Sequence, residues 1–443
     1  MPISPARTAA FDILLRVDQQ DSYASELLHS SRMETLSPVD HALTTELVMG
    51  ALRWRSRLDE TLAAASARSL TKMDAEVLTA LRMGAYQLQY LNRIPAHAAI
   101  NDSVELVKRA HKRSAAPFAN AVLRKIAGTK VEPPSGRFTA SSAEDLAVES
   151  AHPEWLVERW IAEFGIELAT EICRHDQCIP GMAIRLDDGE IETELQAEGI
   201  GFTPGVLLAS ARIVVNGDIA RTRAFHEGRV SIQDEASQLV AALVGRGSRL
   251  LDCCAAPGGK TAAMAARNPT AEIIAAELHP HRVNLLRKRV RAANVQVIQA
   301  DALSLPTSGG FDRVLADVPC SGTGTLARNP EIKWRLKLED LVDLHQKQVA
   351  ILRAALQQLA PDGRAVYSTC SLEREENEDV VEEVLQGEPQ YELLDCREEL
   401  ERLRLTGELV WDDLDLLLRG QFLRTIPGLQ PCDGFFAAVI RRH

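Results

Sequence analysis

The chain has 443 residues, enough for two or three domains, and its 46% hydrophobic and 25% charged residues are typical of a globular protein. Its net charge of −12 at first argues against a nucleic-acid partner, but residues 1–140 carry +4 and the remainder −16, of which residues 371–420 contribute −12. One acidic segment therefore sets the total, so a match to nucleic acid is a local property of the mildly basic first domain.

The sequence lacks the patterns of a membrane or secreted protein. It contains no run of 18 or so apolar residues, and Met1–Thr8 has no signal-peptide pattern. Eight cysteines in this length do not make a disulfide scaffold, and Cys173 and Cys178 are too far apart for a CxxC metal motif. We therefore expect a reducing, cytoplasmic location, with no membrane and no metal among the partners.

Residues 1–130 predict an all-helical domain. Short connections between amphipathic segments indicate a packed bundle. Basic residues gather around Trp54 and again towards the end of the domain, where their density exceeds that of an ordinary mixed helix face. For any single residue a solvated face is the simpler interpretation. The predicted helices are Pro5–Val17, Asp40–Leu52, Asp59–Ala65, Met73–Leu91, Ile100–His111 and Pro117–Ile126; the basic residues are Arg53, Arg55, Arg57, Lys108, Arg109, Lys112, Arg113, Arg124 and Lys125.

A Pro- and Gly-containing stretch at 131–145 predicts a linker, and residues 146–228 predict a small α/β subdomain. A helix starts at His152-Pro153-Glu154 and runs to about Phe164. Strands are expected near Met182–Leu186 and Arg212–Val215. The largest domain then covers residues 229–443.

The centre of that domain is a strand, a Gly-rich loop and a helix start at residues 250–261. Leu250-Leu251 supplies the strand, and Pro257-Gly258-Gly259 forces a turn that lets a ligand approach the backbone. The helix opened by Lys260 presents its N–H groups to that ligand. The loop alone is a weak signal, since many Gly-rich loops are ordinary turns; its residues are Cys254, Ala255, Ala256, Pro257, Gly258, Gly259 and Lys260.

Three further strands follow, each with an acid at or just past its end. They are Glu272–Ala276 before Glu277, Val295–Gln299 before Asp301, and Phe311–Ala316 before Asp317, with helices such as His281–Ala293 between them. This alternation predicts an α/β doubly wound, Rossmann-like parallel sheet, in which ligands bind at the carboxyl ends of strands. Glu277 lies 17 residues past Lys260, close to the usual spacing for an acid that binds ribose hydroxyls. A nucleoside-type cofactor is the resulting hypothesis.

Two cysteines follow strand ends in polar, small-residue turns. Cys320 lies in Asp317–Gly324, and Cys370 follows the predicted strand Arg364–Tyr367. A free cysteine is most often a small core residue. In such turns, however, a thiol is reachable and its thiolate can be favoured.

The rest of the domain is less regular. Leu338–Leu359 predicts a long helix, Pro361-Asp362-Gly363 a turn and Glu375–Leu385 an acidic helix. Residues 386–432 give no clear element, and Gly434–Ile440 predicts a closing strand.

The motifs Cys254–Thr261, Asp317–Gly324 and Ser368–Ser371 together resemble those of S-adenosylmethionine-dependent RNA 5-methylcytosine methyltransferases. The wider resemblance is to the bacterial ribosomal RNA small subunit methyltransferase B type and covers nearly the whole chain. Residues 329–335, 376–378 and 433–436 also look like that family's pattern. One departure is Asp187, where the family usually has Asn, so an RNA contact there is in doubt.

The resemblance implies a NusB-like RNA-binding bundle, an RNA-facing small subdomain and a catalytic domain whose closing strand is antiparallel. It implies S-adenosyl-L-methionine as cofactor, bound by the loop together with Glu277, Asp301 and Asp317. The loop would hold the methionine part, Glu277 the ribose and Asp301 the adenine amino group. The implied partner is 16S ribosomal RNA, free or in an assembly intermediate, and we expect a monomer.

The implied chemistry is methylation of cytosine C5. C5 is a poor nucleophile until a thiolate adds to C6, which calls for a nucleophilic cysteine, an acid near N3 and a second group near C5. The resemblance assigns these roles to Cys370, Asp317 and Cys320, on two strands that it makes neighbours. DNA cytosine methyltransferases instead use the cysteine of a Pro-Cys motif. Two alternatives stay open: a transfer RNA 5-methylcytosine methyltransferase, and a non-catalytic RNA-binding assembly factor.

Overall fold

The computed structural model describes the chain except for residues 1–2, 21, 31–32, 129–137, 139 and 187. Most of the predicted linker and Asp187 therefore lie outside the described residues. The chain forms two compact units, one of residues 1–179 with 326–335, the other of residues 180–325 with 336–443. The first unit thus includes helices α8 (Ala143–Ser150) and α9 (Glu154–Gln177), whose regular geometry is interrupted at Gly165. The domain boundaries expected from the sequence stay predictions.

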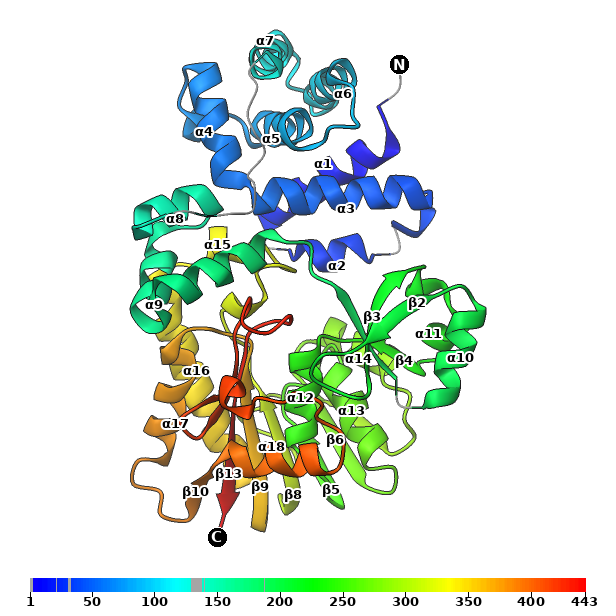
Figure 1. The fold of residues 1–443 in the computed structure, drawn as a ribbon, viewed down its shortest axis with the longest axis vertical. Coiled ribbons are helices and arrows are strands. Elements are labelled where there is room, and N and C mark those ends of the chain that lie inside the picture. Colours follow the sequence, from blue (N-terminus) through cyan, green and yellow to red (C-terminus); the bar gives the residue numbers. More distant parts are fainter. Residues whose placement is uncertain (1–2, 21, 31–32, 129–137, 139, 187) are drawn as a thin grey trace. The chain divides into compact units, whose positions relative to one another are not determined.

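The first unit is helical, as predicted (Figure 1). Ser37 caps the second long helix by accepting a hydrogen bond from the Asp40 backbone N–H, with Pro38 in the first turn, which fixes where that helix begins. The six predicted helices are confirmed with shifted ends: α1 (Pro5–Gln20), α3 (Pro38–Arg53), α4 (Arg55–Ser66), α5 (Ala75–Tyr90), α6 (Ala96–Arg109) and α7 (Ala116–Ala127), with the short α2 (Ala24–Leu28) between the first two.

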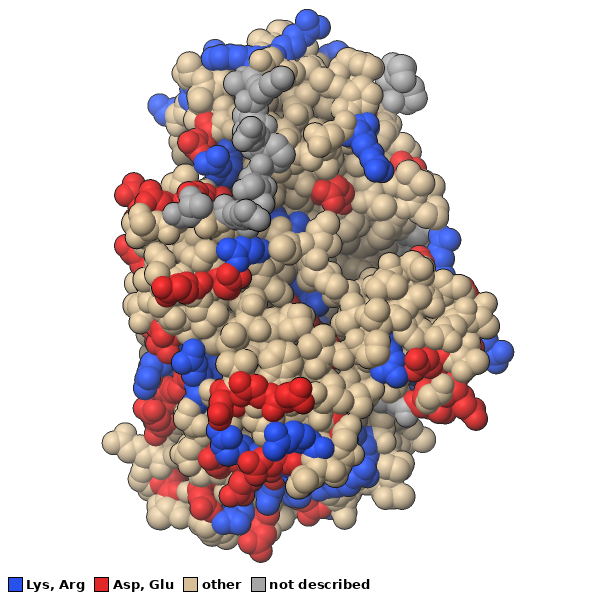
Figure 2. All heavy atoms as spheres, viewed as in Figure 1, with Lys and Arg blue, Asp and Glu red and all other residues tan. Residues whose placement is uncertain are grey.

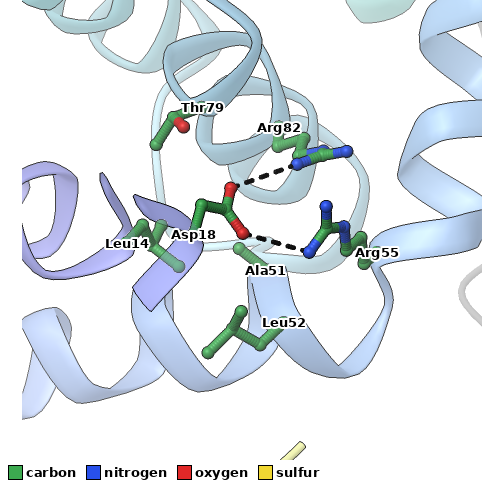
Figure 3. A pocket seen from close by; sticks show the side chains of 7 residues that line it. All are labelled: Leu14, Asp18, Ala51, Leu52, Arg55, Thr79 and Arg82. Carbon is green, nitrogen blue, oxygen red and sulfur yellow. Dashed lines mark hydrogen bonds and ion pairs between the residues drawn. The ribbon is translucent and has the colours of Figure 1, made fainter. Parts of the chain in front are cut away.

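Helix α5 forms the core of this bundle. Most of its residues are buried, and Tyr86 lies so close to Gly50 of α3 that a side chain at position 50 would overlap its ring. Beside α5, a small hollow contains the carboxylate of Asp18, which pairs with Arg55 at 3.0 Å and Arg82 at 3.5 Å (Figure 3). The hollow is a site of packing and ion pairing within the bundle.

The basic residues of this unit are not all available to a ligand. Arg53 is buried and donates hydrogen bonds to the carbonyl oxygens of Asp176 and Ala327, so it holds the unit together and cannot form part of a basic surface, contrary to its grouping with Arg55 and Arg57. In the second cluster, side chains that are partly or largely exposed also form ion pairs: Lys108 with Glu105, Arg109 with Asp12 and Lys112 with Asp74.

The second unit begins with a small antiparallel sheet of order β2-β3-β1-β4. Strands β1 (Met182–Leu186) and β3 (Ala211–Asn216) are the two predicted ones, and β2 (Gly201–Pro204) and β4 (Val230–Ile232) flank them. Helices α10 (Gly189–Ala197) and α11 (Arg223–His226) also belong to this part, and α10 supplies Ile191 and Leu195 to its apolar core.

The large sheet has the order β11-β12-β13-β9-β8-β5-β6-β7, with β10 paired to β13. Its strands β5 to β9 run parallel, and β13 is antiparallel to β9, so the doubly wound sheet with an antiparallel closing strand is confirmed. Strand order reverses between β5 and β8, which is where such sheets bind ligands. The strands are β5 (Arg249–Asp252), β6 (Glu272–Glu277), β7 (Val295–Gln299), β8 (Phe311–Asp317), β9 (Leu359–Thr369), β10 (Tyr391–Leu394), β11 (Leu418–Arg419), β12 (Phe422–Thr425) and β13 (Phe435–Arg442).

Helices cover both faces of this sheet, so its strands are apolar on both sides (Figure 1). Leu250 faces α12 (Glu235–Leu243), α13 (Gly259–Arg267) and α18 (Cys396–Leu405), whereas its neighbour Leu251 faces α16 (Leu338–Gln357) and α17 (Glu378–Leu385). Helix α14 (Pro280–Arg289) packs on β6 and β7.

Two expectations for this region need correction. The predicted turn at Pro361-Asp362-Gly363 lies inside β9, where the pairing with β8 shifts register. Gly363 allows the irregularity, because a Cβ there would lie 2.8 Å from the carbonyl oxygens of Ala360 and Phe311. Residues 386–432, which gave no clear element, form β10, α18, β11 and β12.

The acidic segment 371–420 does not make one negative patch on the face seen in Figure 2, where acidic and basic side chains alternate around α18. Ion pairs such as Arg374–Asp379, Arg397–Asp415 and Arg402–Glu399 account for part of this mixing. Among the described residues, no helix is long and apolar enough to cross a membrane, and no group of three or more His, Cys, Asp or Glu side chains is placed to hold a metal ion.

Candidate active site

The Gly-rich loop connects the carboxyl end of β5 to the first turn of α13. Gly258 caps the helix with φ of 108°, and a Cβ there would lie 2.7 Å from Val290 and 2.9 Å from Leu286. Only glycine fits both the backbone conformation and the space. The turn therefore places no side chain over the start of α13, and it stays a prediction that the backbone N–H groups there face a ligand.

Asp252, the last residue of β5, fixes the position of this loop by a side-chain hydrogen bond to α13. Its carboxylate is fully buried and accepts a 2.7 Å hydrogen bond from the Thr261 hydroxyl on α13. Burial raises the pKa of Asp252 to about 7, so its charged form is costly when unpaired. Its other oxygen, Oδ1, is also buried, and the Cys254 backbone N–H offsets part of the cost of the charge.

The three predicted acids lie at or just past the carboxyl ends of the parallel strands β6, β7 and β8. These strands lie within one run of the sheet, whose order is β7-β6-β5-β8. Glu277 ends β6 and is buried; it accepts a hydrogen bond from the His279 backbone N–H at 2.9 Å and lies 3.6 Å from Arg282. Asp301 follows β7, is exposed, and accepts a hydrogen bond from the Leu303 N–H. Asp317 ends β8.

Asp317 is held by side chains from two other elements. Its Oδ2 accepts a 2.8 Å hydrogen bond from Lys260 Nζ, and its Oδ1 accepts one of 2.8 Å from the Ser368 hydroxyl on β9. Burial alone lowers the pKa of Lys260, but the charge of Asp317 and its hydrogen bond outweigh this, so the net shift is upward. Lys260 therefore stays an ammonium group; it comes from the cofactor loop, but its Nζ binds a carboxylate beside the cysteines.

The two cysteines meet at the ends of adjacent strands. Asp317 pairs with Ser368 across β8 and β9, and this register brings Cys320 Sγ to 3.3 Å from Cys370 Sγ. Both residues are partly exposed. The predicted neighbourhood of these two strands is therefore confirmed.

The two thiols are not equivalent. The hydrogen bond with Cys370, followed by burial, raises the pKa of Cys320 well above its usual range. The expectation that the turn favours a thiolate is therefore wrong for Cys320 while its thiol contacts Cys370.

Glycines bring the loops that carry the cysteines into contact. The Gly324 N–H donates to the Cys370 carbonyl at 2.9 Å, and the Gly434 N–H donates to the Gly324 carbonyl at 2.7 Å. A Cβ on Gly324 would lie 2.3 Å from the Gly434 carbonyl oxygen, so the backbones approach too closely for any side chain. This explains why a glycine stands at position 434 in the pattern noted in the sequence.

The chain matches two family models, the 16S rRNA methyltransferase RsmB/F model over residues 243–441 and the NusB family model over residues 4–128. It is 34% identical to the probable ribosomal RNA small subunit methyltransferase B of Bacillus subtilis (strain 168) over the full length of both chains. It is 31% identical to the ribosomal RNA small subunit methyltransferase B of Vibrio cholerae, covering all of this chain and 98% of the relative.

The chain belongs to the ribosomal RNA small subunit methyltransferase B family. Membership makes it an S-adenosylmethionine-dependent RNA methyltransferase with a NusB-like helical domain. The crystal structure of PH0851 shares the fold over the full length of both chains, with a TM-score of 0.81 at 21% identity. The crystal structure of NSun6 from Pyrococcus horikoshii with SFG shares it over 66% of this chain and 99% of that one, with a TM-score of 0.55 at 20% identity.

The residues present fit the cofactor of this family, S-adenosyl-L-methionine. The turn at Gly258 leaves no side chain over the helix start. The buried carboxylate of Glu277 matches vicinal hydroxyls. We propose that the loop Cys254–Lys260 holds the methionine part, Glu277 the ribose and Asp301 the adenine amino group, with Asp317 at the end towards the substrate.

We expect Glu277→Ala to weaken S-adenosylmethionine binding by about 10- to 100-fold, because a hydrogen bond to a charged group contributes roughly 1.5–3 kcal/mol. Isothermal calorimetry measures this affinity. Glu272→Ala, at the exposed start of the same strand, is the matched control and should bind as tightly as the wild type. Glu277→Gln, which retains an acceptor for the His279 N–H, separates loss of the ligand contact from loss of the turn. Unchanged affinity in both Glu277 variants would remove this residue from the site.

Some residues that build the site were not predicted as part of it. Asp252 and Ser368 lie inside or beside predicted motifs, but nothing in the sequence indicates that their side chains bind Thr261 and Asp317. Glu376 and Asn377 were noted only as part of a family pattern, although both are fully buried behind the cysteines. Their signal is the presence of a polar triplet, 376–378, directly before an amphipathic helix.

Proposed function

We propose that the chain methylates C5 of a specific cytidine in small-subunit (16S) ribosomal RNA through a covalent adduct between Cys370 and cytosine C6. The observation that carries the proposal is the pair of thiols 3.3 Å apart at the ends of β8 and β9, beside an acid held by a lysine. A reaction that needs only a nucleophile would not require a second thiol. Addition followed by elimination requires two groups, one at each of two adjacent ring atoms.

In the proposed reaction the Cys370 thiolate adds to C6, and the electron pair of the C5–C6 double bond moves into the ring, towards N3 and O2. Asp317, bridged to Lys260 and Ser368, would accept a hydrogen bond from the exocyclic amino group next to N3 and so orient the base, while the ammonium group of Lys260 beside it supplies the positive charge that offsets the negative charge developing on the ring. S-adenosylmethionine, when bound, supplies an electrophilic methyl group to C5.

The final step regenerates the enzyme. Cys320 removes the proton from C5, the electrons of the C5–H bond restore the C5–C6 double bond, and the C6–S bond breaks to return Cys370 as a thiolate. Cys320 thereby returns to the neutral thiol of the resting enzyme, and it loses its proton to solvent again in the next cycle once Cys370 is bonded to C6. A cytosine can reach both thiols only when it is unpaired or flipped out of a helix.

The RNA class is supported by the relatives and by the helical unit. Relatives named ribosomal RNA small subunit methyltransferase B align with the full length of the chain, and a NusB family domain matches its N-terminal part. Both favour ribosomal RNA over transfer RNA. We propose that basic residues of this unit that are at least partly exposed neutralise RNA phosphates; they include Lys108, Arg109, Lys112 and Arg113. Those that now pair with protein carboxylates would leave these partners and bind phosphates instead. A cytoplasmic location and a monomeric state stay predictions.

A non-catalytic assembly factor is the weaker alternative. Such a protein would have no need to keep two thiols in contact, nor to keep Lys260 paired with Asp317 beside them.

Bisulfite sequencing tests the function, because 5-methylcytosine resists conversion. We expect one resistant cytidine in 16S RNA after incubation of the purified enzyme and S-adenosylmethionine with RNA from cells that lack the protein. Naked RNA and small-subunit particles, assayed in parallel, distinguish the state of the substrate. Resistance confined to transfer RNA would support the transfer RNA alternative, and no resistant cytidine in any RNA would contradict an enzymatic role.

A further inference from the structure

A buried carboxylate lies behind the two cysteines and has no part in the proposed chemistry. Glu376 ends the short 3-10 turn Arg374–Glu376, six residues after Cys370, and is 0% exposed. Its own backbone carbonyl accepts a 2.6 Å hydrogen bond from the Tyr367 hydroxyl, which ties the turn back to β9.

The two carboxylate oxygens of Glu376 accept four hydrogen bonds. Oε1 accepts from the Ser321 backbone N–H and from the Gln348 side chain of α16, both at 2.8 Å. Oε2 accepts from the Ser371 hydroxyl at 2.5 Å and from the Ser321 hydroxyl. A carboxylate has about this many acceptor positions, so none is left for a substrate.

The donors come from both cysteine loops. Ser321 directly follows Cys320, and Ser371 directly follows Cys370, so one side chain bridges the residues next to the two thiols. The hydroxyls of Ser321 and Ser371 also lie 3.0 Å from each other. The Gln348 side chain additionally donates to the Pro319 carbonyl at 2.9 Å, which holds the first loop from its other side.

Asn377 fixes the second loop in the same way. Its side-chain oxygen accepts a 2.5 Å hydrogen bond from the Thr369 hydroxyl, and its side-chain nitrogen donates to the Ser371 carbonyl at 3.0 Å. Thr369 and Ser371 are the residues on either side of Cys370. Asn377 therefore fixes the backbone on both sides of Cys370, and Glu376 links the loop of Cys370 to the loop of Cys320.

We propose that Glu376 is a positioning residue for RNA methylation that sets the separation of the Cys320 and Cys370 thiols. This role rests on the proposed function, in which both thiols act on one cytosine. Glu376 cannot be a catalytic residue, because it is fully buried and its oxygens are occupied by protein donors. The two thiols must address adjacent ring atoms, so a small increase in their separation impairs catalysis even when each thiol is intact.

The first experiment measures thiol separation without RNA. Diamide takes up two hydrogens from a thiol pair and leaves a disulfide, whose formation between Cys320 and Cys370 is followed by peptide mapping. We expect Glu376→Ala to form this disulfide at least tenfold more slowly than the wild type. Glu382→Ala, which removes an exposed carboxylate from the neighbouring helix α17, is the matched control and should react at the wild-type rate.

The conservative variant Glu376→Gln distinguishes loss of the hydrogen bonds between the two loops from loss of the negative charge. In Glu376→Gln the amide oxygen can accept from the Ser321 N–H and Gln348, while the amide nitrogen donates to the two serine hydroxyls, which can turn to accept. We therefore expect Glu376→Gln to restore most of the disulfide rate lost in Glu376→Ala. If Glu376→Ala does not fold, Ser371→Ala removes one donor alone and should give an intermediate rate.

The second experiment places the variants in a Cys320→Ala background and measures covalent RNA adduct on denaturing gels. Because Glu376 also fixes Ser371, the residue after Cys370, we expect Glu376→Ala to slow adduct formation at least tenfold while calorimetry shows unchanged S-adenosylmethionine affinity. Wild-type disulfide rates in folded Glu376→Ala, or in Ser371→Ala when the former does not fold, would overturn the proposal. If no variant forms an adduct but Glu376→Ala still forms the disulfide more slowly than the wild type, the covalent mechanism is overturned. The role of Glu376 in setting the thiol separation then still stands.

Discussion

Cys370→Ala should lower methyl transfer to RNA by at least about 10³-fold and leave no covalent enzyme–RNA complex, since removal of a catalytic nucleophile typically has effects of this size or larger. Cytosine C5 attacks a methyl donor only after a nucleophile has added to C6. The other thiol at the site cannot substitute, because its loop places Cys320 beside Cys370 rather than in its position. Transfer of radiolabelled methyl groups from S-adenosylmethionine measures the rate, and denaturing gels detect the complex.

Two controls make this result specific. Cys178→Ala removes an exposed cysteine of the first unit and should retain full activity. S-adenosylmethionine affinity should be the same in Cys370→Ala and the wild type, because Cys370 follows β9, whereas the proposed cofactor residues lie at the ends of β5, β6, β7 and β8. If Cys370→Ala still forms the adduct and Cys320→Ala does not, the two roles are reversed and the arrangement of the DNA enzymes applies.

Much of the fold could be predicted because local patterns carry it. Strands such as Val295–Gln299 and Met182–Leu186 are bounded by turn residues, and their predicted limits match the observed ones. By contrast, β9 continues through Pro361-Asp362-Gly363, which would end a strand in isolation. The irregularity is tolerated because Gly363 fits against Phe311, a contact between residues about 50 positions apart that no local pattern contains.

The site divides in the same way. Strand-end positions identified Glu277, Asp301, Asp317 and the cysteines, because parallel strands bring their carboxyl ends to one edge. The partners of these residues were not predictable. Sequence spacing placed Lys260 in the cofactor loop, where its backbone lies, but did not indicate that its Nζ binds Asp317 on another strand.

The acidic character of residues 371–420 was also misleading on its own. Glu376 is one of many carboxylates there, and counting charge gives it no distinction. Only its burial and its four hydrogen bonds, three from the two cysteine loops and one from Gln348 of α16, separate it from exposed neighbours such as Glu382. Side-chain hydrogen bonds between loops depend on tertiary structure, so the sequence alone could not predict them.

Cys320→Ala should have the opposite phenotype to Cys370→Ala: we expect addition and methyl transfer to proceed and an enzyme–RNA adduct to accumulate. The C5 proton then has no base to remove it, so the C6–S bond stays intact. A single round of methyl transfer, with a stoichiometric adduct on denaturing gels, is the expected result. Rapid turnover without adduct would show that Cys320 has no role in release.

The pKa of Cys320 also predicts the timing of this step. Its hydrogen bond with Cys370 is the largest cause of the raised pKa, and the charge of the Cys370 thiolate adds to it. Once Cys370 is bonded to C6 its sulfur carries no charge, so the pKa of Cys320 should fall and the base should become available only after the adduct exists. Because the thiolate of Cys320 is the active form, release in the wild type should become faster as pH rises. Decay of the Cys320→Ala adduct, isolated and shifted in pH, should be slow and should lack this rise; the same rise in the variant would assign the base to another group.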